Sequence, residues 1–423
     1  MASHSLFTPP APGRSPDPAL AHRRGEVTVT VLGRDEHPLA GRDVLVRQTR
    51  HAFGFGCIGF DLLDHAVGAS EDPDYDAVLA EAWLGLFDTA TLPFYWGRFE
   101  PEPARPDTDR LLAAARWFAD HGVRLKGHPL VWHTVSARWL LGRDSHEVER
   151  LQRERIRREV SDFAGVIDTW DAINEAVIMP VFTAEENAIT PLARRMGRVE
   201  TVRMAFEEAR AANPAATLLL NDFDMSTAYE CLIEAVLEAG IQIDRLGLQS
   251  HMHQGYWGEE RTLEVLERFS RYNIPIHFTE TTLLSGELMP GYIDDLNDWQ
   301  VETWPSSPEG EERQAEEIER HYRTLLSHPS VAAATYWGLS DRGMWLGAPG
   351  GLLRADGSPK PAYTRLRNLV RGEWWLEPTT LRTDAAGRLT FSGFLGDYEL
   401  SVDGATTAFT LAEPGAVDLE LRV

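Results

Sequence analysis

The sequence predicts an α/β fold, in which a (β/α)8 TIM barrel carries a small β-sandwich accessory domain built from both chain ends. Between residues 51 and 372, short apolar runs alternate with segments whose apolar residues recur every three or four positions. At each end of the chain, apolar and polar residues alternate between turn-forming residues, which is typical of antiparallel strands. A chain of 423 residues is long enough for one large barrel and a small companion.

The two chain ends supply the predicted sandwich. Residues 1–25 are rich in Pro, Ser and Ala and are predicted to be a disordered tail. Residues 26–50 are predicted to form a β-hairpin around the turn-rich GRDEHPLAG, and residues 373–423 to supply the remaining strands. Because a two-stranded hairpin is rarely stable alone, we expect one sandwich with the barrel inserted between its parts. The alternative is two separate β appendages.

Eight apolar runs are candidates for the barrel strands. They are residues 53–60, 89–96, 124–132, 166–175, 217–224, 245–252, 274–280 and 332–341. Segments with helical spacing lie between them, and several end in Gly or Asn. Strand followed by helix, repeated eight times, is the pattern of the (β/α)8 barrel. A doubly wound sheet would instead need a glycine-rich phosphate loop that leads into a helix, and no helix directly follows FGFGCIGF.

Charge and cysteine content exclude several function classes. Lys and Arg total 41 against 65 Asp and Glu, a formal charge of −24. Such a surface repels phosphate backbones and anionic lipids, so we expect no nucleic-acid or membrane partner. The two cysteines, Cys57 and Cys231, lack the spacing of metal ligands. No signal peptide is recognisable, so we expect a cytoplasmic location, or secretion if the sequence has been trimmed. The oligomeric state stays open.

Polar and aromatic residues follow the predicted strands at their carboxyl ends, where TIM-barrel enzymes hold their active sites. They are His128, Trp132, His133, Asn174, Glu175, Asn221, Asp222, Gln249, His251, His253, Glu280, Trp337 and Asp341. Among them, Glu175 and Glu280 follow the fourth and seventh strands, across a narrow barrel mouth. Glycoside hydrolysis needs one carboxylic acid to protonate the leaving oxygen and one carboxylate to attack the anomeric carbon. The two glutamates therefore indicate a glycoside hydrolase, and a separation short enough for a retaining enzyme is reachable across the mouth.

Six motifs occur in one order along the chain: LKGHPLVWH, WDAINEA, LGLQSHMH, IHFTE, YWGLSD and GSPKPAY. They resemble glycoside hydrolase family 10, the family of many endo-β-1,4-xylanases, and the resemblance covers roughly residues 50 to 370. It implies that Glu175 is the acid/base and Glu280 the nucleophile. It also implies that Asn174 binds the sugar 2-hydroxyl and that His251 and Gln249 hold the nucleophile.

The resemblance also assigns residues to the substrate. His128 and Trp132 would line the glycone side, and Trp337 and Trp345 would form a hydrophobic wall beneath the reacting ring. Tyr95 and Trp96, at the end of the second strand, are further candidates for substrate contact. Their alternative role, like that of any buried aromatic residue, is core packing.

The histidines allow a second hypothesis, a zinc site. His251 and His253 lie close in sequence, with His128 and His133 expected across the mouth. We expect the side chains of His251 and His253 to point to opposite faces of their strand, which disfavours a shared ion. The reaction implied by the resemblance needs no metal and no cofactor.

The sequence departs from the family pattern in two places. Family members have Glu, Asn and Lys after the second strand, where residues 92–95 are Leu-Pro-Phe-Tyr here. Each lost polar contact to sugar costs about 1–3 kcal/mol of binding. Either another loop compensates for these contacts, or the enzyme acts on a different glycone or aglycone. The usual acidic residue soon after the nucleophile is also absent, because Thr281, Thr282 and Leu283 follow Glu280. The long aromatic segment 283–310 is predicted to form a lid or an aglycone wall.

Three functions stay open at this point. The first is a retaining β-glycoside hydrolase whose substrate is β-1,4-xylan or xylo-oligosaccharides. The second is a glycosidase that releases an oligosaccharide from a plant glycoside or saponin with an apolar aglycone. The third, a non-catalytic carbohydrate-binding barrel, is disfavoured because both glutamates and their supporting polar residues are present.

Overall fold

The computed structural model describes residues 17–423, which form two compact units. One unit comprises residues 55–324 and 330–362. The other comprises the described residues up to Gly54 together with residues 325–329 and 363–423. The sequence predicted these boundaries near residues 50 and 372.

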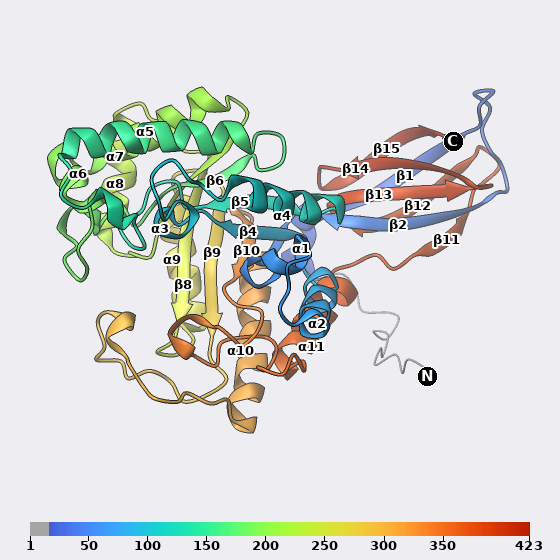
Figure 1. The fold of residues 1–423 in the computed structure, drawn as a ribbon. Coiled ribbons are helices and arrows are strands. Elements are labelled where there is room, and N and C mark those ends of the chain that lie inside the picture. Colours follow the sequence, from blue (N-terminus) through green and yellow to red (C-terminus); the bar gives the residue numbers. More distant parts are fainter. Residues whose placement is uncertain (1–16) are drawn as a thin grey trace. The chain divides into compact units, whose positions relative to one another are not determined.

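The first unit is a closed eight-stranded barrel (Figure 1). All neighbouring strands pair in parallel, and the first strand, β3, closes the barrel against the last, β10. The strands are β3 (Gly54–Ile58), β4 (Thr89–Pro93), β5 (Arg124–His128), β6 (Thr169–Asn174), β7 (Thr217–Asp222), β8 (Arg245–Met252), β9 (Ile276–Leu283) and β10 (Val331–Tyr336). Each lies in one of the predicted apolar runs or overlaps it. The predicted TIM barrel is confirmed.

Helices connect the barrel strands. They are α1 (Leu63–Ala66), α2 (Pro73–Leu84), α3 (Trp96–Phe99), α4 (Thr108–Asp120), α5 (Ser145–Asp162), α6 (Ile189–Met196), α7 (Arg198–Ala212), α8 (Thr227–Glu238), α9 (Gly258–Ser270), α10 (Pro308–Ser327) and α11 (Pro361–Asn368). Helix α4 shows why the spacing predicts them: Leu111, Ala115 and Phe118 recur every three or four positions and are buried. Short 3₁₀ turns η2 (Phe60–Leu62), η4 (Met179–Val181) and η6 (Trp345–Gly347) follow strands β3, β6 and β10.

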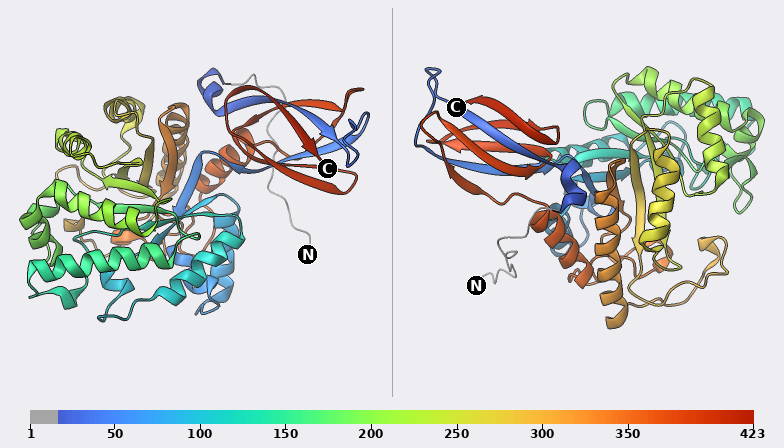
Figure 2. Two further views of the ribbon diagram at one scale, coloured as in Figure 1. Left: turned by 90° about the horizontal axis from the view of Figure 1, so that it is seen from above. Right: turned by 180° about the vertical axis from the view of Figure 1, so that it is seen from behind.

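The second unit is a β-sandwich to which both chain ends contribute. Its strands are β1 (Arg24–Leu32), β2 (Asp43–His51), β11 (Thr379–Arg382), β12 (Arg388–Phe394), β13 (Gly396–Val402), β14 (Ala405–Leu411) and β15 (Gly415–Arg422). Strand β1 lies between β12 and β15 in one sheet, and β2 lies between β11 and β13 in the other. Figure 2 shows these two N-terminal strands, in blue, among the red C-terminal ones. The accessory domain built from both ends is therefore confirmed.

Alternating side chains form the core of this sandwich. Val27 and Val29 of β1 pack with Val44 and Val46 of β2 and with Leu400 of β13. These residues are two apart along each strand, so they share one face, and the intervening side chains face outward.

The disordered tail predicted for residues 1–25 extends too far along the chain. Its first sixteen residues lie outside the part of the chain that the structure describes. Residues Pro18–Arg23, however, form a 3₁₀ turn capped by Asp17, with Leu20 buried, and β1 begins at Arg24. Composition alone missed this turn because one buried leucine and one cap hold it.

Candidate active site

The candidate site lies at the carboxyl ends of neighbouring barrel strands. Asn174 is the last residue of β6, and Glu175 follows it. Gln249 and His251 belong to β8, and Glu280 belongs to β9. Gln249 is the register partner of Glu280 on the adjacent strand. The barrel thus brings together all five residues to which the family resemblance gives catalytic or supporting roles.

Amide side chains connect the two glutamates. Asn221, at the end of β7, donates from Nδ2 to Asn174 Oδ1 (2.7 Å) and to Glu280 Oε1 (3.0 Å). Gln249 donates from Nε2 to Asn174 Oδ1 (3.1 Å) and to Glu175 Oε1 (3.3 Å). The orientation of Asn174 is fixed by these two donors. Asn221 was noted in the sequence only as a rim residue, and the structure places it against Glu280.

Glu175 has a constrained backbone and a largely buried carboxyl group, with 14% of its side chain exposed. Its φ of 57° is left-handed, a conformation that costs a residue with a Cβ atom free energy. Its backbone N–H donates to the carbonyl of Asn221, and Trp132 Nε1 donates to Glu175 Oε2 at 2.7 Å. Burial, with the negative charges of Glu280 and Asp222 adding to it, raises the pKa of Glu175 to about 8, although the Trp132 hydrogen bond opposes this shift. The group is therefore a proton donor at neutral pH.

Glu280 is held in the opposite protonation state. Burial alone would raise its pKa, but the positive charges of His128 and Lys126 and a hydrogen bond from His251 Nε2 (3.1 Å) outweigh burial and lower it. The pKa values of Glu175 and Glu280 are therefore pushed apart. One carboxyl group is protonated while the other is ionised, which is the division of roles that acid and nucleophile need.

A buried charge cluster beneath the site supplies that positive charge. Asp171 of β6 accepts from Lys126 Nζ (2.7 Å) and His128 Nδ1 (2.7 Å), both on β5. Burial would raise the pKa of Asp171, but the charge of Lys126 and the His128 hydrogen bond lower it. Neither Lys126 nor Asp171 was assigned a role from the sequence. The sequence feature that could have identified them is a charged residue in the interior of each of two predicted strands. Charged side chains at such positions are buried only when they are paired.

Aromatic rings line one side of the site. Tyr95 lies 5.6 Å from both His128 and Trp132 between ring centroids, and His128 lies 5.1 Å from Trp337. Phe60, which the sequence did not single out, joins them at 5.9 Å from Tyr95 and 5.7 Å from Trp337. These rings form one continuous aromatic wall, to which the segment that departs from the family pattern contributes Tyr95.

Trp345 and the two histidines at the carboxyl end of β8 form a second aromatic group. Trp345 lies 5.0 Å from His251 and 5.2 Å from His253, and the two imidazoles are 5.9 Å apart. The expectation that His251 and His253 point to opposite faces is wrong, because residues two apart share a face. Within residues 17–423, no group of three His, Cys, Asp or Glu side chains could hold a metal ion.

Trp96 does not join the other predicted substrate residues. It begins α3 and is only 4% exposed. Its Nε1 donates to Glu100 Oε2 at 3.0 Å, and the guanidinium of Arg155 lies over its ring. Trp96 therefore packs α3 against α5. Its position matches core packing, which the sequence left as the alternative to substrate contact.

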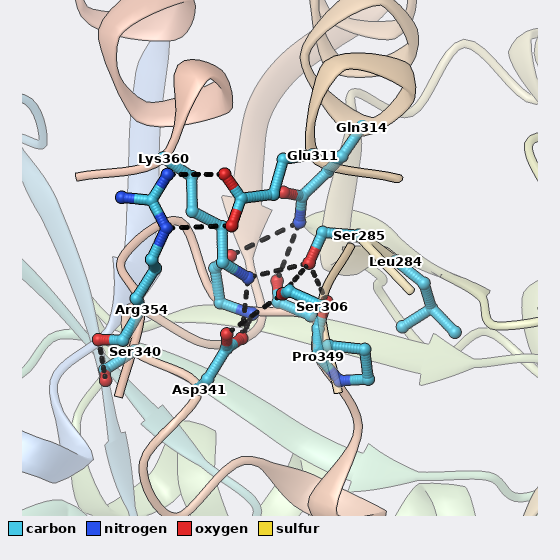
Figure 3. A network of polar contacts seen from close by, with 12 residues as sticks. Leu284, Ser285, Ser306, Glu311, Gln314, Ser340, Asp341, Pro349, Arg354 and Lys360 are labelled. Carbon is cyan, nitrogen blue, oxygen red and sulfur yellow. Dashed lines mark hydrogen bonds and ion pairs between the residues drawn. The ribbon is translucent and has the colours of Figure 1, made fainter. Parts of the chain in front are cut away.

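A separate polar network ties the loops after β9 and β10 (Figure 3). Lys360 Nζ, fully buried, donates to Ser285 Oγ (2.8 Å) and to Asp341 Oδ1 (2.8 Å). Arg354 binds Glu311 through two nitrogen atoms. Asp341, which the sequence placed on the rim, thus serves this network. The GSPKPAY motif contributes Lys360 as a structural residue.

Comparison with known proteins assigns the family. The model of glycosyl hydrolase family 10 matches residues 96–369, well over half of the chain. The chain belongs to glycosyl hydrolase family 10. It is therefore a glycoside hydrolase, and its homologues act on carbohydrate.

Relatives within the family are distant in sequence. The chain is 25% identical over 314 residues to an endo-1,4-beta-xylanase/feruloyl esterase of Xylanibacter ruminicola and spans only 40% of that protein. It is 27% identical over 340 residues to an endo-1,4-beta-xylanase of Geobacillus stearothermophilus, covering 72% of this chain and 96% of that one. Among solved structures, a family 10 protein from Paenibacillus barcinonensis superposes with a TM-score of 0.63 at 20% identity, covering 77% of this chain and 97% of that one. That likeness supports the fold alone.

The departure from the family pattern at residues 92–95 has a structural explanation. Leu92 and Phe94 are fully buried, and Phe94 packs against Phe99, Phe163 and Trp170. These two side chains are part of the barrel core, and Tyr95 alone turns toward the site.

No helix among residues 17–423 is long and apolar enough to span a membrane.

Proposed function

We propose that this family 10 member is a retaining β-glycoside hydrolase that cleaves β-1,4-xylan or xylo-oligosaccharides by double displacement. The observation that carries the proposal is one hydrogen-bonded cluster in which Asn174, Asn221 and Gln249 join the two carboxyl groups. The opposite directions in which their pKa values are shifted support it. Burial and two neighbouring carboxylates raise the pKa of Glu175 to about 8, whereas positive charge lowers that of Glu280. The relatives named as endo-1,4-beta-xylanases support the choice of substrate.

In the first step a carboxylate oxygen of Glu280 forms a bond to the anomeric carbon. The glycosidic bond breaks at the same time, and its oxygen leaves with the proton of Glu175. The Asn174 amide, fixed by Asn221 and Gln249, is placed to bind the 2-hydroxyl of the reacting sugar. Trp132 holds the Glu175 carboxyl group in place through its indole N–H.

The second step reverses the roles. Once Glu280 is esterified, its negative charge no longer acts on Glu175, and one cause of the raised pKa disappears. Glu175 is then a carboxylate that takes a proton from water, the water oxygen bonds to the anomeric carbon, and Glu280 leaves as a carboxylate. Two inversions give net retention of configuration.

The experiment is hydrolysis of xylan and xylo-oligosaccharides by the purified protein, followed by proton NMR of the first products. The proposal expects xylo-oligosaccharide products with the β-anomer appearing first. Initial release of the α-anomer would contradict double displacement, and absence of cleavage would contradict the substrate.

A second candidate substrate is a glycoside with an apolar aglycone. Two apolar side chains are exposed after neighbouring strands: Val181 (60%) in η4 after β6, and Phe223 (46%) directly after β7. Their loops are linked, because the backbone N–H of Val177 donates to Asp222 Oδ2. Exposed apolar groups on the loops that follow β6 and β7 favour an apolar leaving group. Saponins incubated in parallel with xylan, with products separated by chromatography, distinguish the candidates: release of an intact oligosaccharide selects the second.

A further inference from the structure

The nucleophile is the first member of a hydrogen-bonded relay of three side chains. His251 Nε2 lies 3.1 Å from Glu280 Oε2, and His251 Nδ1 lies 3.0 Å from Thr282 Oγ1. His251 and Thr282 are register partners on β8 and β9, so the strand pairing itself brings them together. Glu280 and Thr282 are buried. The relay ends in a hydroxyl group at the position after the nucleophile where the sequence lacks the family's usual acidic residue.

Counting protons shows which protonation states this relay allows. An ionised Glu280 only accepts, so His251 Nε2 carries a proton and donates it. A neutral imidazole has no second N–H, and the Thr282 hydroxyl then donates to Nδ1. A carboxylate in place of Thr282 would only accept, which would require N–H groups on both nitrogens and hence an imidazolium. With the Thr282 hydroxyl in place, a neutral His251 keeps its hydrogen bonds to both Glu280 and Thr282.

The surroundings of His251 do not supply a second counter-charge. Trp337 and Trp345 flank its ring at 6.1 and 5.0 Å. Burial lowers the pKa of the neighbouring His253 to about 3, so this residue is neutral. In the described part of the chain, Glu280 is the one carboxylate hydrogen-bonded to His251. The ionisable groups that act on Glu280 or His251 from neighbouring elements are Lys126, His128, Glu175, Tyr95 and His253.

We propose that Thr282 is a positioning residue of the nucleophile, whose hydroxyl group keeps His251 a neutral Nε2–H donor to Glu280. The proposal rests on the proposed role of Glu280 as nucleophile. When Glu280 bonds to the anomeric carbon its charge is consumed, and a neutral donor then leaves no uncompensated buried cation behind. An imidazolium would stabilise the free carboxylate more than the ester and so raise the barrier to attack.

Three variants at one position test the proposal. Thr282→Val removes the hydroxyl at constant shape and is expected to lower kcat by about ten- to hundredfold with KM little changed, because an unpaired buried nitrogen loosens the ring. Thr282→Ser is expected to restore most of kcat. Thr282→Asp adds an acceptor that favours an imidazolium at His251, so it is expected to lower kcat with KM little changed, because the barrier to attack rises.

The matched control is Thr281→Val. It removes a buried hydroxyl one residue away, which pairs with Ser250 Oγ at 2.8 Å and not with His251. This variant is expected to keep the kcat/KM pH profile of the parent protein. Thermal unfolding of each variant verifies folding, and if Thr282→Asp does not fold, the Val and Ser variants decide the matter.

A measurement without substrate separates this proposal from the proposed function. Nitrogen NMR of the parent protein with isotope-labelled histidine is expected to show His251 protonated at Nε2 and unprotonated at Nδ1 at neutral pH. Protonation of both nitrogens, or a Thr282→Val variant with parental kcat, would overturn the role of Thr282. A parent protein with this tautomer that cleaves no β-glycoside would instead overturn the proposed function.

Discussion

The hydrogen bond from Trp132 to Glu175 should influence how the activity of the enzyme depends on pH. Its N–H donates to Oε2 at 2.7 Å, and this bond favours the ionised carboxylate and lowers the pKa. A hydrogen bond to a charged group contributes about 1.5–3 kcal/mol, and one pKa unit corresponds to about 1.4 kcal/mol. Trp132→Phe removes the donor and keeps an aromatic ring. We therefore expect the pKa of Glu175 to rise from about 8 by roughly one to two units.

The assay is the pH profile of kcat/KM on an aryl β-xyloside with a poor leaving group, for which proton donation limits the rate. Because Glu175 acts in its protonated form, activity falls as pH rises through its pKa, and the variant's falling limb should move to higher pH. Trp139→Phe is the control, since it removes an indole donor bound to the Glu100 carbonyl. A falling limb that stays in place or moves to lower pH in Trp132→Phe would refute the assignment of Glu175 as the acid.

Three further predictions test other parts of the structure. Glu280→Ala should abolish turnover, and added azide should restore part of it by forming an inverted glycosyl azide. Glu175→Ala should still cleave substrates with good leaving groups. Parental activity of Glu280→Ala would refute the assignment of Glu280 as the nucleophile. Lys126→Met leaves Asp171 without its buried ion pair, so urea unfolding should show a loss of about 3–5 kcal/mol, and the pKa of Glu280 should rise because a positive charge is gone. Lys360→Met should destabilise the loops after β9 and β10 by about 3 kcal/mol without moving either limb of the pH profile, as thermal unfolding and kinetics would show.

The barrel could be predicted because its strands are buried on both faces. Parallel strands of this kind are mostly apolar runs, and most of their polar residues lie where a strand approaches the rim. Glu175 and Gln249 were identified for this reason. The sandwich could be predicted because the strands at both chain ends alternate with period two, as Val27 and Val44 illustrate.

The remaining site residues required coordinates, because the direction of a side chain is not encoded in its neighbours. Trp132 and Trp96 are both tryptophans at strand ends, yet one donates to Glu175 and the other to Glu100. Asp341 follows β10 at the rim but turns to Lys360. Each of these outcomes depends on a partner far away in sequence, which no local pattern reveals.

Trapping of the covalent intermediate tests the central claim most directly. A fluorinated β-xyloside that forms the glycosyl-enzyme quickly and hydrolyses slowly should add one sugar to the protein mass. Peptide sequencing should place that sugar on Glu280, and the Glu280→Ala variant should stay unlabelled. A sugar on any other residue, or active hydrolysis with no covalent adduct, would contradict double displacement at Glu280.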